Sequence, residues 1–285
     1  MRKLHYMLIL TMAAVISGCS EKKDMEFAPV DNSGYTLIEA DLQTLLGSEQ
    51  RLWPADASIG VYGSEKGENE RYTIKNAGAG LKSASFYGPL VKGDIVACYP
   101  YSSSYQGKID AMPVALESEQ VYGADPIAHF IKYTPMAFGY MQGGKLDFVY
   151  PNGLLHVTVE TFDALTVKKM TVSSQSAKLA GTGVLQNGGV LNLTGASTNL
   201  VSLDCGEGVL SRNGEKYADF YIVLLPGMYD DLALTVEIES EEPLTRVLPQ
   251  FEVKRMSAED MSITSVIIKP SSGPDDFTDN EVEFE

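Results

Sequence analysis

Alternation of apolar and polar residues every second position recurs along the chain and constrains its fold more than any other feature. Segments 155–160 and 232–239 alternate in this way, as expected of strands with one face in a core and one in water. Continuous apolar runs at 95–99 and 220–225 suit strands that are covered on both faces. The pattern predicts an all-β protein.

Helical periodicity is poor. Only Ala40–Leu46 and Ser257–Met261 are expected to form one or two helical turns, too short for the crossovers of a parallel sheet. A hairpin is expected at Val184–Leu191, where Asn187 and Gly188 suit a two-residue turn. Many short strands without helices favour antiparallel β-sandwiches.

The length of the strand-rich region favours two sandwich domains. We expect five segments: a signal peptide (1–18), a tether (19–34), an N-terminal β-sandwich (35–162), a C-terminal β-sandwich (163–270) and an acidic tail (271–285).

The N-terminus has the layout of a secretory signal. Arg2 and Lys3 precede a short apolar stretch that ends in Ile16-Ser17-Gly18-Cys19, and the stretch is shorter than the ~20 residues that span a bilayer. The last four residues resemble the lipobox of bacterial lipoproteins, in which the cysteine is lipidated and becomes the first residue. We therefore expect a lipid on Cys19 and no other cofactor; the alternative is an ordinary signal peptide with an accidental cysteine.

The polar segment after Cys19 is expected to be a flexible tether that holds a globular body off the membrane. Charge is strongly one-sided, with 22 basic and 38 acidic residues and a net charge of −16. Such a surface repels phosphate backbones and anionic headgroups. We expect no nucleic-acid partner, and expect the lipid, rather than a basic patch, to hold the chain to the membrane.

Two further cysteines, Cys98 and Cys205, lie in or beside strand-like segments far apart in the sequence. A disulfide between them is one alternative. Two separate buried thiols acting as small hydrophobic residues is the other, and their spacing favours it. The sequence has no CxxC motif of a zinc or redox site.

Several segments resemble, in order, the fimbrillin-like lipoproteins of Bacteroidales, including components of type V pili such as the Mfa-like proteins. The segments are Trp53 with Ser58–Tyr62, Asp94–Tyr101, Thr134–Phe138 with Leu146–Phe148, Leu154–Val159, and Phe220–Pro226. Relatives often carry Phe-x-His near residue 150, whereas Phe148 and His156 are spaced differently here.

The resemblance implies two tandem transthyretin-like (Ig-like) antiparallel β-sandwiches on a lipoprotein at the outer face of the outer membrane. It implies a pilus subunit, anchor or tip component that acts in adhesion and has no enzymatic activity. In pilus-forming members of the family an arginine-directed protease removes the first strand, and a strand from the next subunit fills the groove. Partners would be other pilin subunits and a glycan or protein on a host or bacterial surface.

Three groups of residues are candidates for parts of such a function: two residues of the tail, three tyrosines and one arginine. Val282 and Phe284 alternate with acids in the tail, as a donor strand would; a disordered acidic tail is the alternative. Tyr99, Tyr101 and Tyr105 could contact a glycan, which supports a carbohydrate-binding surface lipoprotein as the alternative function; a packed strand end is the other interpretation.

His129, in an expected loop, and His156, on an expected strand surface, have no ligand at metal spacing, so no metal site or catalytic residue is assigned.

Arg51 is the candidate cleavage site, because it follows the first strand-like run and precedes Trp53; a solvated loop arginine is the simpler alternative. If the precursor is processed here, an arginine-specific protease is expected to give a stable fragment that begins at Leu52. N-terminal sequencing of the digest checks this. Absence of that fragment contradicts cleavage at Arg51.

Overall fold

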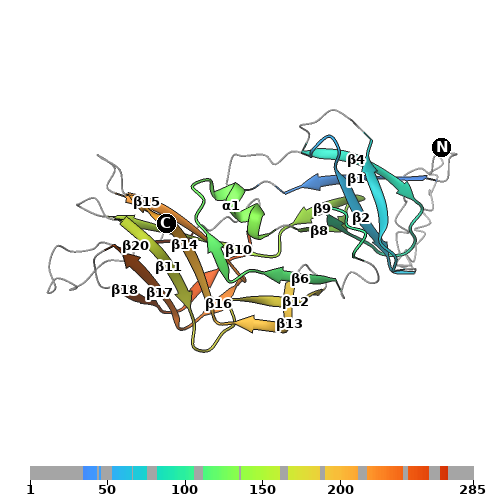
Figure 1. The fold of residues 1–285 in the computed structure, drawn as a ribbon. Coiled ribbons are helices and arrows are strands. Elements are labelled where there is room, and N and C mark those ends of the chain that lie inside the picture. Colours follow the sequence, from blue (N-terminus) through green and yellow to red (C-terminus); the bar gives the residue numbers. More distant parts are fainter. Residues whose placement is uncertain are drawn as a thin grey trace, which may run out of the picture.

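The structure is a computed structural model. It describes residues 35–43, 45, 53–65, 67–75, 82–105, 112–134, 136–160, 166–186, 190–210, 217–239, 243–256 and 264–268. The predictions for Cys19, Arg51, Val282 and Phe284, and for a helical turn at Ser257–Met261, lie outside the described residues. The all-β class is confirmed, since the described part of the chain contains one short helix among its strands (Figure 1).

The first lobe is a closed barrel (Figure 1). Its seven strands, in their order around the barrel, are β1 (Tyr35–Leu42), β4 (Ser83–Pro89), β3 (Glu70–Ile74), β2 (Ser58–Gly63), β5 (Ile95–Tyr99), β8 (Ala137–Gln142) and β9 (Lys145–Val149). Every neighbouring pair is antiparallel except β1 with β9, which is parallel. A ring of seven strands cannot alternate in direction all the way round, so one parallel pair closes it.

The second lobe, at the other end of the elongated molecule in Figure 1, is built from sheets that pair distant segments. One sheet has the order β18 (Leu244–Leu248), β17 (Leu232–Ile238), β11 (Thr166–Ser173), β14 (Leu200–Leu210), β7 (Glu119–Val121). Another has the order β15 (Tyr217–Leu224), β10 (Gly153–Glu160), β20 (Thr264–Ile268). Two smaller sheets consist of β13 (Val190–Thr198), β12 (Ala180–Gln186) and β6 (Pro113–Leu116), and of β16 (Gly227–Tyr229) with β19 (Phe251–Val253).

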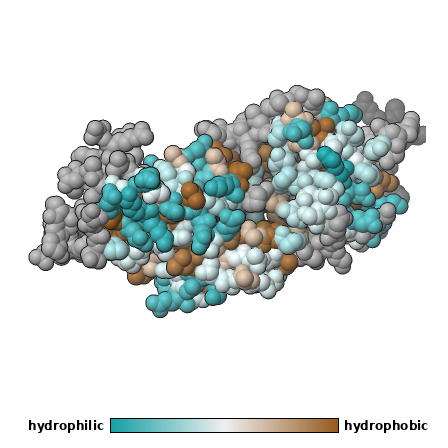
Figure 2. All heavy atoms as spheres, in the orientation of Figure 1, coloured by the Kyte–Doolittle hydropathy of each residue, from teal (hydrophilic) through white to brown (hydrophobic). Residues whose placement is uncertain are grey.

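The alternating segments form half-buried strands as predicted. In β10, Leu155, Val157 and Val159 are buried while His156 and Thr158 are partly exposed. In β17 every second residue is buried, from Leu232 to Ile238. The buried apolar residues of both lobes form one continuous core. On the face shown in Figure 2, hydrophobic residues form small separate groups among hydrophilic ones.

Three expectations about local structure are corrected. The helical turn expected at Ala40–Leu46 is wrong, because residues 40–42 lie in β1 and pair with β9. Parallel pairing was disfavoured, yet β1–β9, β10–β20 and β14–β7 are parallel. Parallel partners so far apart in sequence do not need a crossover helix. The expected loop around His129 is instead the helix α1 (Pro126–Tyr133), which Asp125 caps with its side chain.

The predicted hairpin is confirmed, but its connection is longer than expected. Gln186 of β12 pairs with Val190 of β13, so three residues, rather than two, separate the paired ends. Two tandem sandwiches are not confirmed: the first lobe is a barrel-like sheet. The boundary between 162 and 163 stays a prediction, and strand pairing crosses it, because β6, β7 and β10 bond to β12, β14 and β15.

Among the residues described, no helix is long and apolar enough to cross a membrane.

Trp53 is the centre of the barrel core. Its side chain is 1% exposed and makes edge-to-face contacts with Phe86, Tyr99 and Phe148, at centroid distances of 4.8, 4.9 and 5.4 Å. Its indole Nε1 donates a hydrogen bond to the Ala40 carbonyl in β1 at 3.2 Å. Trp53 therefore connects β1, β4, β5 and β9, as a core residue and not a binding platform.

Trp53→Ala is expected to lower the free energy of unfolding by about 3–5 kcal/mol, because it leaves a cavity and removes the hydrogen bond from the indole to Ala40. Denaturant unfolding followed by circular dichroism measures the change, since Trp53 is the only tryptophan. Met228→Ala is the control, because Met228 is 61% exposed. A change below about 1 kcal/mol for Trp53→Ala would contradict this role.

Candidate functional site

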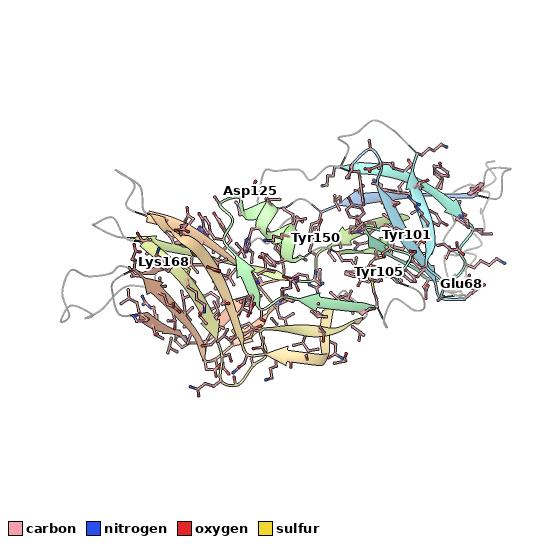
Figure 3. The ribbon with its side chains drawn as sticks, viewed as in Figure 1. Glu68, Tyr101, Tyr105, Asp125, Tyr150 and Lys168 are labelled. Atoms are coloured by element: carbon pink, nitrogen blue, oxygen red, sulfur yellow. The ribbon has the colours of Figure 1, made fainter. Side chains whose placement is uncertain are left out.

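The loop after β5 carries two of the three tyrosines that the sequence singled out, and Figure 3 labels Tyr101 and Tyr105 on the barrel lobe. Tyr99 itself ends β5, and its ring packs against Trp53 and Phe148. Tyr99 thus has a packing role. Tyr101 and Tyr105 are partly buried, and Tyr105 packs against the core; glycan contact by them stays a prediction.

Hydrogen bonds fix this loop on the outside of the barrel. Asn69 Nδ2 donates to the Ser102 carbonyl at 2.9 Å, and the Tyr101 amide donates to the Ser58 carbonyl of β2 at 2.9 Å. The buried Tyr62 hydroxyl donates to the Tyr105 carbonyl at 3.1 Å. Gly60 permits this close packing, since a Cβ there would lie 2.1 Å from Asn69 Oδ1. The loop is therefore held in one conformation.

Cys98 lies beneath the loop, with its Sγ 3.9 Å from the Tyr62 hydroxyl. Cys98 and Cys205 are both free and buried, so the expectation of two separate thiols is confirmed. Burial raises the pKa of Cys98 to about 11 and that of Cys205 to about 12. Both stay protonated near neutral pH and are not nucleophiles there.

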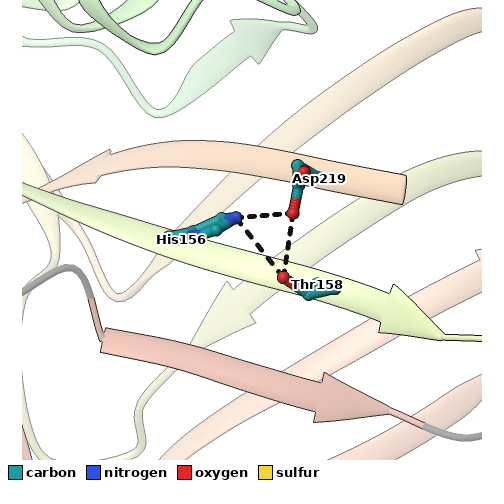
Figure 4. A network of polar contacts seen from close by, with 3 residues as sticks. All are labelled: His156, Thr158 and Asp219. Atoms are coloured by element: carbon teal, nitrogen blue, oxygen red, sulfur yellow. Dashed lines mark hydrogen bonds and ion pairs between the residues drawn. The ribbon is translucent and has the colours of Figure 1, made fainter. Parts of the chain in front are cut away.

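A polar cluster lies on the second lobe, where β10 and β15 pair (Figure 4). His156 Nε2 donates to Asp219 Oδ1 at 2.7 Å, and Thr158 Oγ1 donates to the same oxygen at 2.9 Å. The His156 ring stacks on Tyr221 with centroids 4.9 Å apart and planes 21° apart. His156 was expected to be a surface residue; its side chain is 19% exposed and is paired.

This cluster resembles a hydrolytic triad only in composition. In a triad the histidine stands between the hydroxyl and the carboxylate and takes the hydroxyl proton. Here one carboxylate oxygen accepts from both His156 and Thr158, and Thr158 Oγ1 is 3.4 Å from the His156 nitrogen that faces Asp219. Thr158 is therefore not activated as a nucleophile, and the cluster acts as a cross-strand polar contact.

A second histidine, His129, is buried in α1 and belongs to a polar cluster that sequence analysis did not detect. Its Nε2 donates to Gln120 Oε1 at 3.2 Å. The Gln120 side chain is 1% exposed and bonds both backbone groups of Val223, accepting from N at 2.9 Å and donating to O at 2.8 Å. These bonds join β7, α1 and β15. The only signals in the sequence are Asp125-Pro126 as a helix start and a glutamine among β-strand residues.

Burial lowers the pKa of His129 from 6.5 to about 4, with a smaller effect from Lys132. His129 is therefore neutral in the folded protein at pH 5–7, whereas in the unfolded chain it takes up a proton near pH 6.5. Between those two pKa values the unfolded state binds more protons than the folded state. His129 thus destabilises the fold progressively as the pH falls from about 6.5 toward 4.

Replacement His129→Gln is expected to weaken the loss of stability between pH 7 and pH 4.5. The free energy of unfolding is measured at several pH values for both proteins. His156→Gln is the matched control, because His156 is partly exposed and faces Asp219. Equal slopes for wild type and His129→Gln would contradict a buried neutral His129.

Among the described residues no group of three or more His, Cys, Asp or Glu side chains could hold a metal ion. A groove of about 540 Å³ runs beside β6 and β12 and is lined by Leu116 and by small or polar residues: Ala115, Glu117–Glu119, Gly181, Thr182 and Ala196–Thr198. No large aromatic side chain lines it.

Comparison with solved structures gives a clear result for the fold. A "putative cell adhesion protein" from Bacteroides ovatus matches 82% of this chain and 90% of its own with a TM-score of 0.51 and 16% identity. The fimbrillin-like resemblance is confirmed in the fold. At this identity the likeness shows the fold alone.

Two further structures are more distant. A "putative cell adhesion protein" from Bacteroides uniformis covers 83% of this chain and 94% of its own at 13% identity and a TM-score of 0.45. The tip fimbrial protein Mfa3 from Porphyromonas gingivalis, with a C-terminal truncation, covers 85% and 95% at 11% identity and a TM-score of 0.41. No family model matches the chain, and no curated protein matches it.

Proposed function

We propose that the chain is a non-enzymatic adhesion protein of the cell surface, a fimbrillin-like lipoprotein that acts as a pilus subunit, anchor or tip component. The single observation that carries the proposal is the fold likeness to the Bacteroides ovatus adhesion protein over 82% of the chain. The lipobox-like run that ends at Cys19 adds to it, because an anchored chain is held where an adhesin acts.

The described surface supports a binding role over catalysis. Thr158 is not activated by His156, the thiols of Cys98 and Cys205 are buried and protonated, and His129 is enclosed. In this proposal the two lobes are variants of tandem transthyretin-like domains. The closed barrel is the N-terminal unit, which has β1 as its first strand.

The proposal includes a covalent lipid on Cys19 that anchors the protein to the outer membrane. Cys19→Ala is expected to abolish incorporation of radiolabelled palmitate and to release the protein from the membrane fraction. Labelling of cells and fractionation check this. Cys98→Ala is the matched control, since Cys98 is buried beneath the loop after β5 and its replacement is expected to leave labelling unchanged.

The N-terminus of the surface form separates the alternatives within this function. A lipidated Cys19 on the surface indicates an anchor or a monomeric lipoprotein, whereas a new terminus near Leu52 indicates a polymerising subunit. Sheared pili that contain the chain in detergent-resistant ladders would support a subunit role. A surface-exposed, lipidated protein that never copurifies with pili and promotes no adhesion would overturn the proposal.

A further inference from the structure

Exposed aromatic rings cross the outside of the barrel on neighbouring strands. Tyr35 of β1 is 48% exposed and Tyr87 of β4 is 43% exposed. Their rings meet edge to face with centroids 6.2 Å apart. Leu37 pairs with Tyr87 in the ladder, so Tyr35 and Tyr87 are diagonal neighbours on one face. Large aromatic side chains at this exposure are candidates for contact with a ligand.

The same face continues across β3 toward the fixed loop. Thr73 of β3 pairs with Tyr87 on one side and with Ser58 of β2 on the other. Arg71, two residues before Thr73, is on the same side of β3. Its guanidinium carbon lies 5.5 Å from the centroid of the Tyr101 ring. We call Tyr35, Tyr87, Thr73, Arg71 and Tyr101 the tyrosine face.

Arg71 is exposed, and no described carboxylate forms an ion pair with it. Its contact with the Tyr101 ring does not use its N–H donors as hydrogen-bond donors to a carboxylate. The Thr73 hydroxyl, one strand away from Tyr87, adds a small donor and acceptor between the rings. The face therefore combines apolar ring surfaces with hydrogen-bonding groups.

The tyrosine face is also rigid. β1 and β4 are joined along seven residue pairs, and the Tyr101 loop is fixed through Ser58 and Asn69. Tyrosine loses little conformational entropy on binding, and a preformed site loses less still. The face extends from β4 across β3 to the loop that follows β5, and adjacent strands are about 4.8 Å apart, so the face is long enough for an extended ligand.

We propose that the tyrosine face binds an oligosaccharide. Sugar rings present apolar C–H surfaces to aromatic rings and hydroxyl or carboxylate oxygens to donors such as Arg71 and Thr73. The inference goes beyond the proposed function, since it assigns a ligand class and five residues that bind whether or not pili assemble. Of the three tyrosines chosen from the sequence, it retains Tyr101 as a direct contact.

Other occupants fit the observations less well. A second copy of the chain carries the same net charge of −16, which opposes association through this exposed face; strand addition in a pilus would use a groove instead. Five side chains also fall short of the ~1,000 Å² that a specific protein interface requires. Nucleic acid is repelled by the acidic surface, and one arginine does not offset that repulsion.

The test is binding of purified full-length protein in detergent to a glycan array, followed by calorimetry. The array holds neutral oligosaccharides of glucose, galactose, mannose and N-acetylglucosamine, and acidic ones with sialic or uronic acids. We expect saturable binding of at least one. Tyr87→Ala is expected to weaken it about tenfold or more, and Tyr87→Phe to retain it. Arg71→Gln is expected to weaken an acidic ligand more than a neutral one.

Met228→Ala is the matched control, because Met228 is also a large exposed side chain but lies in β16, away from the tyrosine face. Circular dichroism and the melting temperature verify that each variant is folded. Absence of saturable binding to any oligosaccharide would overturn the proposal, as would equal affinities for wild type and Tyr87→Ala. A dimer that Tyr87→Ala dissociates would overturn it in favour of a second copy. Pilus isolation tests the proposed function separately, so either can fail alone.

Discussion

Closure of the barrel by β1 is the constraint on which the first lobe depends. β1 pairs with β4 along one edge and with β9 along the other, and it supplies the one parallel pair that a seven-stranded ring requires. The Ala40 carbonyl receives the Trp53 indole bond from inside the barrel. Tyr35 and Leu37 face outward from the same strand. Core packing, barrel closure and the tyrosine face therefore share one strand.

The link between the lobes depends on the residue that follows β1. Gln43 is buried, accepts a hydrogen bond from the Tyr150 amide and donates one to the Met256 carbonyl, both at 3.2 Å. The Met256 amide in turn donates to the Asn152 carbonyl at 3.1 Å. Buried polar groups of this kind are costly when unpaired, so they specify one arrangement of the segments that they join. The N-terminal strand is thus tied to residues more than 200 positions later in the chain.

Local patterns predicted the strands well, because the two-residue period of β10 and β17 reports directly which side chains are buried. They failed where distant partners decide the outcome. Ala40–Leu42 reads locally as part of a helical turn, but the β4 and β9 ladders impose an extended backbone on it. Barrel closure and the pairing of β6, β7 and β10 across the expected boundary are likewise long-range features that carry no local signal.

The candidate residues also divide into those that a local pattern predicts and those whose position depends on distant partners. Tyr99, Tyr101 and Tyr105 are close together in the sequence. Tyr99 nevertheless packs against Trp53, whereas Tyr101 contacts Arg71 on the outside of the barrel. Tyr35 and Tyr87 lie on the same face as Tyr101, but no sequence pattern marks them. Only the register of β1 against β4 brings their rings together. Gln120 and His129 also lack a motif, since their bonds to each other and to Val223 join three separate elements.

The position of β1 also affects whether a cut after Arg51 would separate the segment that contains Cys19 from the barrel. A cut after Arg51 would break the covalent link between β1 and Trp53, but both ladders of β1 and the bonds of Gln43 would remain. Loss of β1 from the barrel would expose two strand edges and leave the Trp53 indole without the Ala40 carbonyl. A cut alone would therefore leave β1 and the residues before it bound to the barrel. Release requires another strand that pairs with β4 and β9 and supplies apolar side chains at the inward positions of Ile38, Ala40 and Leu42.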